Sequence, residues 1–368
     1  MANPGQPDRL PPGPQGHRGR VELLMTGGSG ASSPHQVDSA GRPQRPWLRA
    51  ILWLLVVVLL ALALRGVDWA NLAALLSGLH PVEMGLILVV NAGVLLALSS
   101  RWWLVLRAQQ VVVVYGWLSL YRLAGFAVSY FTPGPQFGGE PLLVQLLRQR
   151  HDLPASQGAA SVALDKALEL VVNFSFLLFG LLVVAQLGLL ETPLVAGMIL
   201  VAGGLVCLPL AYLLAAARGG QPLRWLLGWL PRRAQALPGW EKWQAWLAEV
   251  ESSAGSVFAR RPGWLVGALL ASLTTWVLLV FEYWLMAGFL GFSLDPLEAV
   301  AVLTAARVAI LLPLPAGLGT LEASQVLALG QLGFPAEAGL ALALVIRGRD
   351  LLFGGSGLVA GALLLERH

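Results

Sequence analysis

Long apolar runs separated by short polar stretches dominate the chain from residue 47 onward. A helix needs about 20 apolar residues to cross the roughly 30 Å hydrocarbon layer of a bilayer. The runs lie near 47–64, 84–106, 111–131, 157–190, 193–217, 263–291 and 337–365, with a shorter one near 297–312. This pattern predicts an all-α polytopic integral membrane protein with about eight transmembrane helices.

Two further stretches, 133–150 and 313–333, contain too many prolines and glycines to be ordinary spans. Proline removes a backbone hydrogen bond and clashes with the preceding turn, so a continuous helix is excluded. We expect each stretch to hold a break followed by a half-helix. Backbone groups freed at such breaks are tolerated at membrane depth only where protein or a wet cavity satisfies them.

The two interrupted stretches share one pattern, Pro-Gly-Pro-Gln-Phe-Gly-Gly-Glu at 133–140 and Pro-Ala-Gly-Leu-Gly-Thr-Leu-Glu at 315–322. Each follows an apolar segment that holds one arginine, Arg122 or Arg307, and precedes a charge cluster within an apolar run. Broken helices at corresponding positions of two halves are typical of transporter sites. We therefore predict an inverted repeat. Its units cover about 111–190 and 297–365.

The segment 218–262 alternates tryptophans with charged residues, which suits helices lying in the headgroup region. Its basic residues, like those before the first span, indicate the cytoplasmic side. If each broken segment crosses the membrane, this segment and both termini lie inside, whereas mere re-entry places the segment outside. We favour crossing on this ground. Residues 1–46 are rich in Pro, Gly, Ser, Gln and Arg and are predicted to be a disordered cytoplasmic tail, with residues 47–365 as the membrane domain.

Composition supports membrane insertion, because 57% of the residues are hydrophobic and only 12% are charged. The net charge of +4 follows from basic segments flanking apolar runs, so nucleic acid is not an expected partner. The single cysteine, Cys207, excludes an intrachain disulfide, and the five histidines are scattered. We expect neither a metal nor a cofactor.

The half-helix glutamates have two interpretations. Glu140 and Glu322 either cap free N–H groups at the helix start, or leave those N–H groups for an anionic headgroup while pairing a cation. The arginines deep in apolar segments need compensation as well. For Arg122 and Arg307, an ion pair with Glu140, Glu322 or Asp350 and a contact with phosphate are equally open.

For other charged residues, the sequence leaves open whether they lie in the membrane core or at its interface. Asp165, Lys166 and Glu169 lie either in the membrane core or at its interface, because 170–190 alone could span the bilayer. Glu282 lies near the end of a span, where we expect it to extend to the interface. The candidate substrate-binding residues are Arg122, Gly134, Gly138, Gly139, Glu140, Asp165, Lys166, Glu169, Arg307, Gly317, Gly319, Glu322, Arg347 and Asp350.

Through the motif at 133–140, Ala-Ser-Val-Ala-Leu-Asp-Lys at 160–166 and Pro-x-Pro-Ala-Gly-Leu-Gly-x-x-Glu at 313–322, the sequence resembles the lysylphosphatidylglycerol synthase transmembrane-region family over roughly 47–365. In bifunctional members of that family, the membrane region moves aminoacylated phosphatidylglycerol between leaflets after a soluble C-terminal domain has attached the amino acid. The resemblance implies lipid handling. Because the chain ends at His368, we expect no aminoacyl-transferase domain.

The leading hypothesis is a flippase-like lipid translocase or carrier in the cell membrane that moves a phospholipid or other phosphate-bearing lipid between leaflets. The expected partner is an anionic or aminoacylated phospholipid. One alternative is a membrane-embedded transferase with Asp165 or Glu140 as general base, although no nucleophile motif accompanies them. Another is a non-catalytic partner of a separate lipid-modifying enzyme, contacted through 222–260. Homo-oligomerisation is left open.

Overall fold

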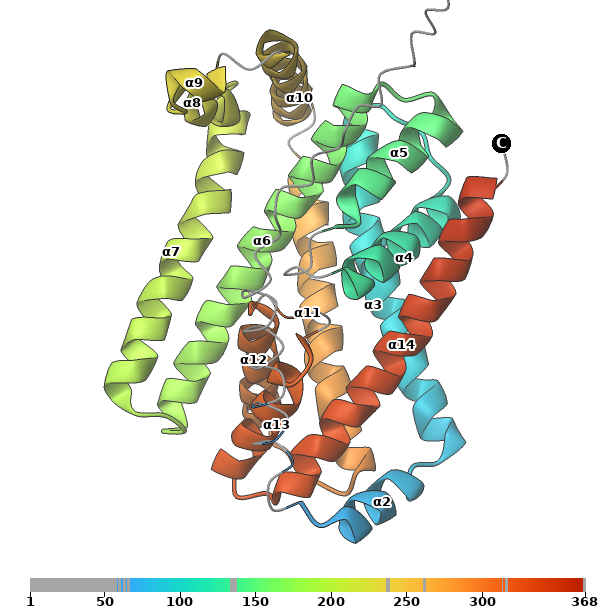
Figure 1. Cartoon of the computed structure of the whole chain (residues 1–368), viewed down its shortest axis with the longest axis vertical. Coiled ribbons are helices and arrows are strands. Elements are labelled where there is room, and N and C mark those ends of the chain that lie inside the picture. Colours follow the sequence, from blue (N-terminus) through green and yellow to red (C-terminus); the bar gives the residue numbers. More distant parts are fainter. Residues whose placement is uncertain are drawn as a thin grey trace, which may run out of the picture. The chain divides into compact units, whose positions relative to one another are not determined.

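A computed structural model describes most of the chain beyond the predicted tail. The described residues are 58, 61, 64, 67–132, 138–235, 239–260, 263–312, 314 and 317–366. The predicted tail and most of the predicted first span lie outside them. Within these ranges every regular element is a helix, as the all-α prediction requires (Figure 1).

The helices have the following bounds: α2 Trp69–Ser77, α3 Pro81–Ala108, α4 Tyr115–Phe131, α5 Glu140–His151, α6 Ala155–Gln186, α7 Thr192–Ala217, α8 Pro222–Gly228, α9 Arg232–Gln235, α10 Trp240–Arg260, α11 Trp264–Phe289, α12 Pro296–Ile310, α13 Thr320–Gln331 and α14 Ala336–Glu366. Five of them, α3, α6, α7, α11 and α14, are long and apolar enough to cross a membrane. Each coincides with a predicted run. The chain is therefore a multi-pass membrane protein.

Helices α4 and α12 are shorter, with 17 and 15 residues. Each is followed by a break and then by a half-helix of 12 residues, α5 or α13. At 1.5 Å per residue, a half-helix is about 18 Å long, which is too short to cross the hydrocarbon layer. The predicted breaks with following half-helices are confirmed.

Each half-helix folds back along the helix before it. The Tyr121 hydroxyl, early in α4, lies 3.1 Å from Nε2 of His151, the last residue of α5. In the second half, the side-chain amide Nε2 of Gln325 donates to the Val302 carbonyl of α12 at 3.4 Å. The α4–α5 hairpin, hereafter hairpin one, lies in the upper half of Figure 1, and the α12–α13 hairpin, hairpin two, lies in the lower half.

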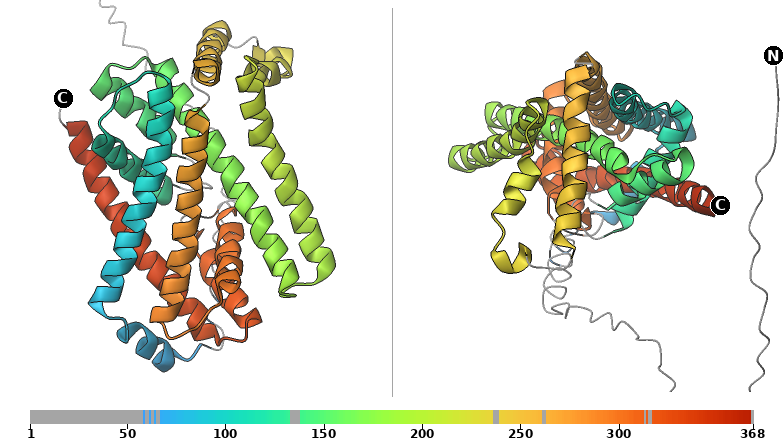
Figure 2. Two further views of the ribbon diagram at one scale, coloured as in Figure 1. Left: turned by 180° about the vertical axis from the view of Figure 1, so that it is seen from behind. Right: turned by 90° about the horizontal axis from the view of Figure 1, so that it is seen from above.

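The packing of the helices repeats between the two halves. Helix α3 packs against α11, while α4 packs against α14 and α12 packs against α6 (Figure 2). These are the pairings expected when α3–α6 and α11–α14 are equivalent units related by a two-fold axis. This packing fits units that begin one helix before the predicted boundaries of 111 and 297, which stay a prediction. Helix α7 packs mainly on α6.

Glycines allow the close approaches on which this packing depends. A Cβ atom on Gly357 of α14 would lie 2.3 Å from the Leu123 carbonyl oxygen of α4. A Cβ on Gly339 would lie 2.4 Å from Val326 Cα of α13. Small residues at such crossings are the usual means of helix association in membranes. The α4–α14 and α13–α14 contacts are therefore backbone to backbone.

Hairpin one returns the chain to the end of the bundle at which α4 begins. The Arg150 guanidinium, at the end of α5, donates to the Leu364 carbonyl near the end of α14. We predicted two full crossings at this point. The structure instead shows a short hairpin, which has the same effect on chain direction, so α8–α10 and the end of α14 lie toward the same end (Figure 1).

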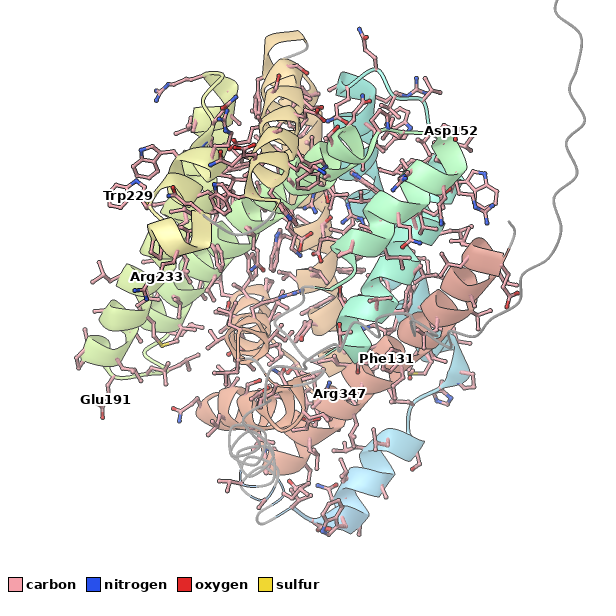
Figure 3. The ribbon with its side chains drawn as sticks, turned by 45° about the horizontal axis from the view of Figure 1, so that its top comes forward. Phe131, Asp152, Glu191, Trp229, Arg233 and Arg347 are labelled. Carbon is pink, nitrogen blue, oxygen red and sulfur yellow. The ribbon has the colours of Figure 1, made fainter. Side chains whose placement is uncertain are left out.

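The predicted interfacial segment forms α8, α9 and α10. Trp225, Trp229 and Trp243 are 65%, 73% and 64% exposed, and Trp229 lies at the periphery in Figure 3. Glu251 of α10 accepts hydrogen bonds from the Leu223 and Arg224 N–H groups at the start of α8, at 2.6 and 3.4 Å. Burial raises the pKa of this carboxyl. The helices of this segment are thus joined by a buried helix cap.

Candidate functional site

Asp165 is the centre of a buried ion cluster in the first repeat. Its carboxylate accepts from Arg101 Nε of α3 at 2.8 Å and from Arg122 Nη2 of α4 at 2.6 Å. Glu169, one turn further along α6, accepts from Arg101 Nη2 at 3.0 Å. Only 4% of Asp165 is exposed, so these charges compensate one another rather than being solvated. The cluster ties three helices together.

Lys166 joins the first half-helix to this cluster. Its Nζ donates to Glu169 Oε1 at 2.8 Å and lies 3.4 Å from Glu140 Oε1. The other Glu140 oxygen accepts from the Gly138 N–H at 2.9 Å, while the Gly139 N–H donates to Ser129 Oγ at 3.0 Å. Glu140 therefore pairs a cation and also satisfies backbone at the helix start. Capping and pairing with a cation thus occur together, while binding of a headgroup at this helix start stays a prediction.

The second repeat holds its half-helix through Glu322 and Arg347. Arg347 Nε donates to Glu322 Oε1 at 3.0 Å, and its Nη2 donates to the Gly317 carbonyl at 2.8 Å. Arg347 lies among the central helices in Figure 3. Gly319 precedes α13 with a φ of 75°, a conformation that glycine adopts without strain. The tip of hairpin two is thus held by α14.

Glu282 is fully buried, at 0% exposed, which contradicts its predicted extension to the interface. It forms an ion pair with Arg349 of α14 and accepts from Asn91 Nδ2 of α3 at 2.5 Å. Arg349 also donates to Asp350 at 2.8 Å. The carboxylate does not need to reach water because a guanidinium and an amide are supplied within the protein.

A cavity of about 330 Å³ lies between the tips of the two hairpins and α3, α6, α11 and α14. Its basic lining residues are Arg101, Arg122, Lys166, Arg307, Arg347 and Arg349, and its acidic ones are Glu140, Glu169 and Asp350. The other three acids of the clusters, Asp165, Glu282 and Glu322, lie behind these cations and do not line it. The cavity surface therefore carries an excess of positive charge.

Arg307 differs from the other five cations, each of which has a carboxylate within 4.0 Å. Among the described residues, Arg307 forms no ion pair, and its buried Nε has no hydrogen-bond partner. Its guanidinium lies 4.9 Å from the ring centroid of Trp276, which stacks on Phe176. Such a cation–π contact offsets only part of the cost of burying a charge.

The structure brings most predicted site residues together. Arg122, Gly139, Glu140, Lys166, Glu169, Arg307, Gly317, Arg347 and Asp350 line the cavity. Asp165 and Glu322 lie one layer behind it, and Gly138 and Gly319 lie at the hairpin tips, while Gly134 is outside the described residues.

The expected ion-pair partners were wrong for both arginines. Arg122 pairs with Asp165 and Glu169, and Arg307 pairs with none among the described residues.

Sequence reasoning missed three residues that line the cavity. Arg101 is an isolated charge inside the apolar run 84–106, and this isolation was a signal that we did not use. Arg349 belongs to the Arg347–Asp350 cluster but was not chosen as a site residue. Nothing in the local pattern distinguishes Trp276 from the other tryptophans.

The residues that form this cavity fall within a match to a known family. The family described as "Lysylphosphatidylglycerol synthase TM region" matches residues 49–355, which include both hairpins and most of α14. The chain belongs to this family. Membership connects the protein to membrane lipids and indicates a lipid-related function, with a membrane lipid as its partner. No curated protein and no solved structure matches the chain.

Proposed function

We propose that this member of the lysylphosphatidylglycerol synthase transmembrane-region family translocates a phosphate-bearing lipid between leaflets, with the headgroup passing through the cavity between the hairpins. The observation that carries this proposal is the lining of that cavity, in which six cations face three acids. The three acids behind the lining compensate the cations that they pair with, so the attraction for an anion is concentrated at Arg307, which has no carboxylate partner among the described side chains. An anionic phospholipid, including an aminoacylated one, is the class of substrate that fits.

The lining also favours a lipid over a small soluble anion. Val94, Leu98, Leu123, Phe126 and Ile346 lie in the same cavity as the cations. A lipid presents a charged headgroup next to hydrocarbon, so it matches both kinds of surface at once. A small hydrophilic anion would leave the apolar part wet.

Arg307 is the group that we expect to bind the phosphate. The other cations are each engaged by a carboxylate, so an incoming anion would have to compete for them. Arg307 has no such competitor among the described side chains, and its planar guanidinium offers paired donors to phosphate oxygens. A bound headgroup would supply the compensation that Arg307 lacks.

The charges at the two ends of the bundle support an orientation in the cell membrane. At one end lie Arg107, Arg148, Arg150, Arg218, Arg224, Arg233 and Lys242. The opposite end carries Asp68, Glu83, Glu191, Asp295, Glu298 and Glu337, and its described segments 67–83, 187–195, 290–298 and 332–338 contain no lysine or arginine. By the positive-inside rule, the basic end is cytoplasmic, with both chain termini on that side.

We propose transport rather than catalysis. Asp165, one of the two candidate bases of the transferase hypothesis, is held by two guanidinium groups and does not line the cavity. Glu140, the other candidate, is occupied by Lys166 and by the backbone of its own half-helix. Neither arrangement resembles a base that is free to accept a substrate proton.

The test is translocation of a headgroup-labelled phospholipid in proteoliposomes, with phosphatidylglycerol and phosphatidylcholine as the two substrates. We expect faster movement of phosphatidylglycerol and at least a tenfold loss of that rate in Arg307→Gln, which corresponds to about 1.4 kcal/mol. Arg107→Gln is the matched control, because Arg107 also lies over a tryptophan, 4.8 Å from the Trp103 centroid, but outside the cavity. A wild-type rate in Arg307→Gln contradicts the proposal.

A further inference from the structure

One wall of the cavity is apolar and partly accessible. Leu95 and Leu98 of α3, Phe126 of α4 and Phe353 of α14 form part of the cavity lining. Phe126 is nevertheless 38% exposed, and the other three are partly exposed. Phe126 therefore belongs to the cavity lining and keeps more than a third of its surface accessible.

This wall lies at one of two equivalent seams of the repeat. Because α3 corresponds to α11 and α6 to α14, the seam between α3 and α14 is the counterpart of the seam between α11 and α6. The α6–α11 seam is closed by Phe176 and Trp276, whose rings stack with centroids 3.9 Å apart and planes 14° apart. Over their described lengths, α3 and α14 form no comparable packing contact. The two seams thus differ although the surrounding helices correspond.

We propose that the α3–α14 seam is a lateral passage that holds the acyl chains of a membrane glycerophospholipid while its headgroup occupies the cavity. This inference rests on the proposed function and adds a second, apolar subsite to it. Acyl chains in the seam remain next to bilayer hydrocarbon, so only the headgroup needs the polar environment that the two hairpins provide. The occupant is the hydrocarbon of a lipid, since a free phosphate has no group that suits Leu95, Leu98 and Phe126.

The first experiment labels the seam directly in the wild-type chain. The protein is reconstituted in vesicles of phosphatidylglycerol and phosphatidylcholine with a trace of phosphatidylglycerol that carries a photoactivatable diazirine on an acyl chain. Ile346 lines the cavity and is 2% exposed, so surrounding lipid cannot reach it from outside. We expect label on Ile346 as well as on Leu96, which is 46% exposed and faces outward. Label on Leu96 without label on Ile346 would overturn the passage.

The second experiment blocks the seam. Leu98→Trp places a larger side chain in the passage, and Leu96→Trp is the matched control on the outer face of the same helix. We expect Leu98→Trp to lower phosphatidylglycerol translocation at least tenfold and to remove the label from Ile346, while the affinity for inorganic phosphate, measured by calorimetry, stays within twofold. Leu96→Trp should change neither quantity. Wild-type translocation in Leu98→Trp, or an equal loss in Leu96→Trp, contradicts the inference.

The two proposals can fail separately. If the wild-type protein does not translocate phosphatidylglycerol but Ile346 is labelled, the transport function is wrong and the acyl-chain subsite stands. If translocation is observed and Ile346 is unlabelled, the function stands and the passage is wrong. Should Leu98→Trp not fold, Leu95→Trp tests the same wall, and the labelling of the wild-type chain is unaffected.

Discussion

The two hairpins have half-helices of equal length and occupy equivalent places in the repeat, yet different forces hold their tips. In hairpin one, the Glu140 and Lys166 side chains are 26% and 18% exposed. In hairpin two, Glu322 and Arg347 are only 8% and 11% exposed. Water therefore reaches the first ion pair more readily than the second. A common backbone arrangement does not impose a common environment on the charges at its tips.

Backbone contacts are closer at the tip of hairpin one than at the tip of hairpin two, whereas the ion pair is more buried in hairpin two. At the tip of hairpin one, a Cβ on Gly139 would lie 2.2 Å from the Gly125 carbonyl oxygen. At the tip of hairpin two, a Cβ on Gly317 would meet Thr320 Oγ1 at an ordinary 3.5 Å. The tip of hairpin one is thus fixed by close backbone packing and a partly exposed ion pair, and the tip of hairpin two by a buried ion pair with wider spacing at Gly317.

The ion pairs between long helices show that chemistry has diverged on the same scaffold. Arg101 of α3 pairs with Asp165 of α6, whereas at the corresponding helices Glu282 of α11 pairs with Arg349 of α14. The two pairs connect equivalent helices with the signs of charge reversed. The helix arrangement therefore needs a compensated pair at this place but does not determine which helix carries the cation.

The largest difference between the hairpins is expected from removal of the half-helix glutamates. Glu322→Ala leaves Arg347 buried without its carboxylate, so we expect a loss of about 3–5 kcal/mol of stability. Glu140→Ala affects a partly hydrated pair and should lower stability by about 1 kcal/mol or less. Unfolding in detergent, followed by circular dichroism, measures both.

A double variant provides the control for this prediction. Glu322→Leu combined with Arg347→Met removes both charges, and most of the lost stability should return because apolar side chains replace both members of the buried pair. Equal destabilisation by Glu140→Ala and Glu322→Ala would contradict the difference in burial between the two tips.

A smaller effect is expected from filling the backbone contact in hairpin one. Gly139→Ala forces a methyl group against the Gly125 carbonyl, and such overpacking typically lowers stability by about 1–3 kcal/mol. Gly116→Ala, in α4, meets nothing within 4 Å and should leave stability unchanged or raise it slightly. The same unfolding measurement applies, and a neutral Gly139→Ala would argue against close packing at this tip.

The smallest perturbation compares how readily water reaches the two hairpin tips, without removing a charged side chain. In a Cys207→Ser background, a thiol at Ser129, which lines the cavity beside hairpin one, should react with a water-soluble methanethiosulfonate at least ten times faster than a thiol at Thr320, which is 3% exposed. Only the ionised thiol in contact with water reacts, so the rate reports hydration. Equal rates would mean that both tips are equally wet.

The positions of the half-helices could be predicted from the sequence because proline and glycine act locally. The breaks before Glu140 and Thr320 follow from the missing N–H groups and free dihedral angles of the residues at 133–139 and 313–319. The repeat was visible for the same reason, since both halves carry the same interruption.

The partners of the charged residues could not be predicted in this way. Glu282 has a local pattern that suits the interface, yet α14 supplies Arg349 at a separation of 67 residues. Arg122 meets Asp165, which is 43 residues away and was not among its expected partners. Such choices depend on how helices cross, and the crossings are set by glycines whose contacts no single segment reveals.

The two half-helix tips face one cavity near the middle of the bundle, and this arrangement has an electrical consequence. Where water enters from each side as far as the tips, the membrane potential falls mainly across the region between them instead of across the full hydrocarbon thickness. Moving one elementary charge through that region then involves nearly the whole potential, about 2.3 kcal/mol per 100 mV. An ion or headgroup that moves past Arg307 would cross most of the membrane potential over a short distance.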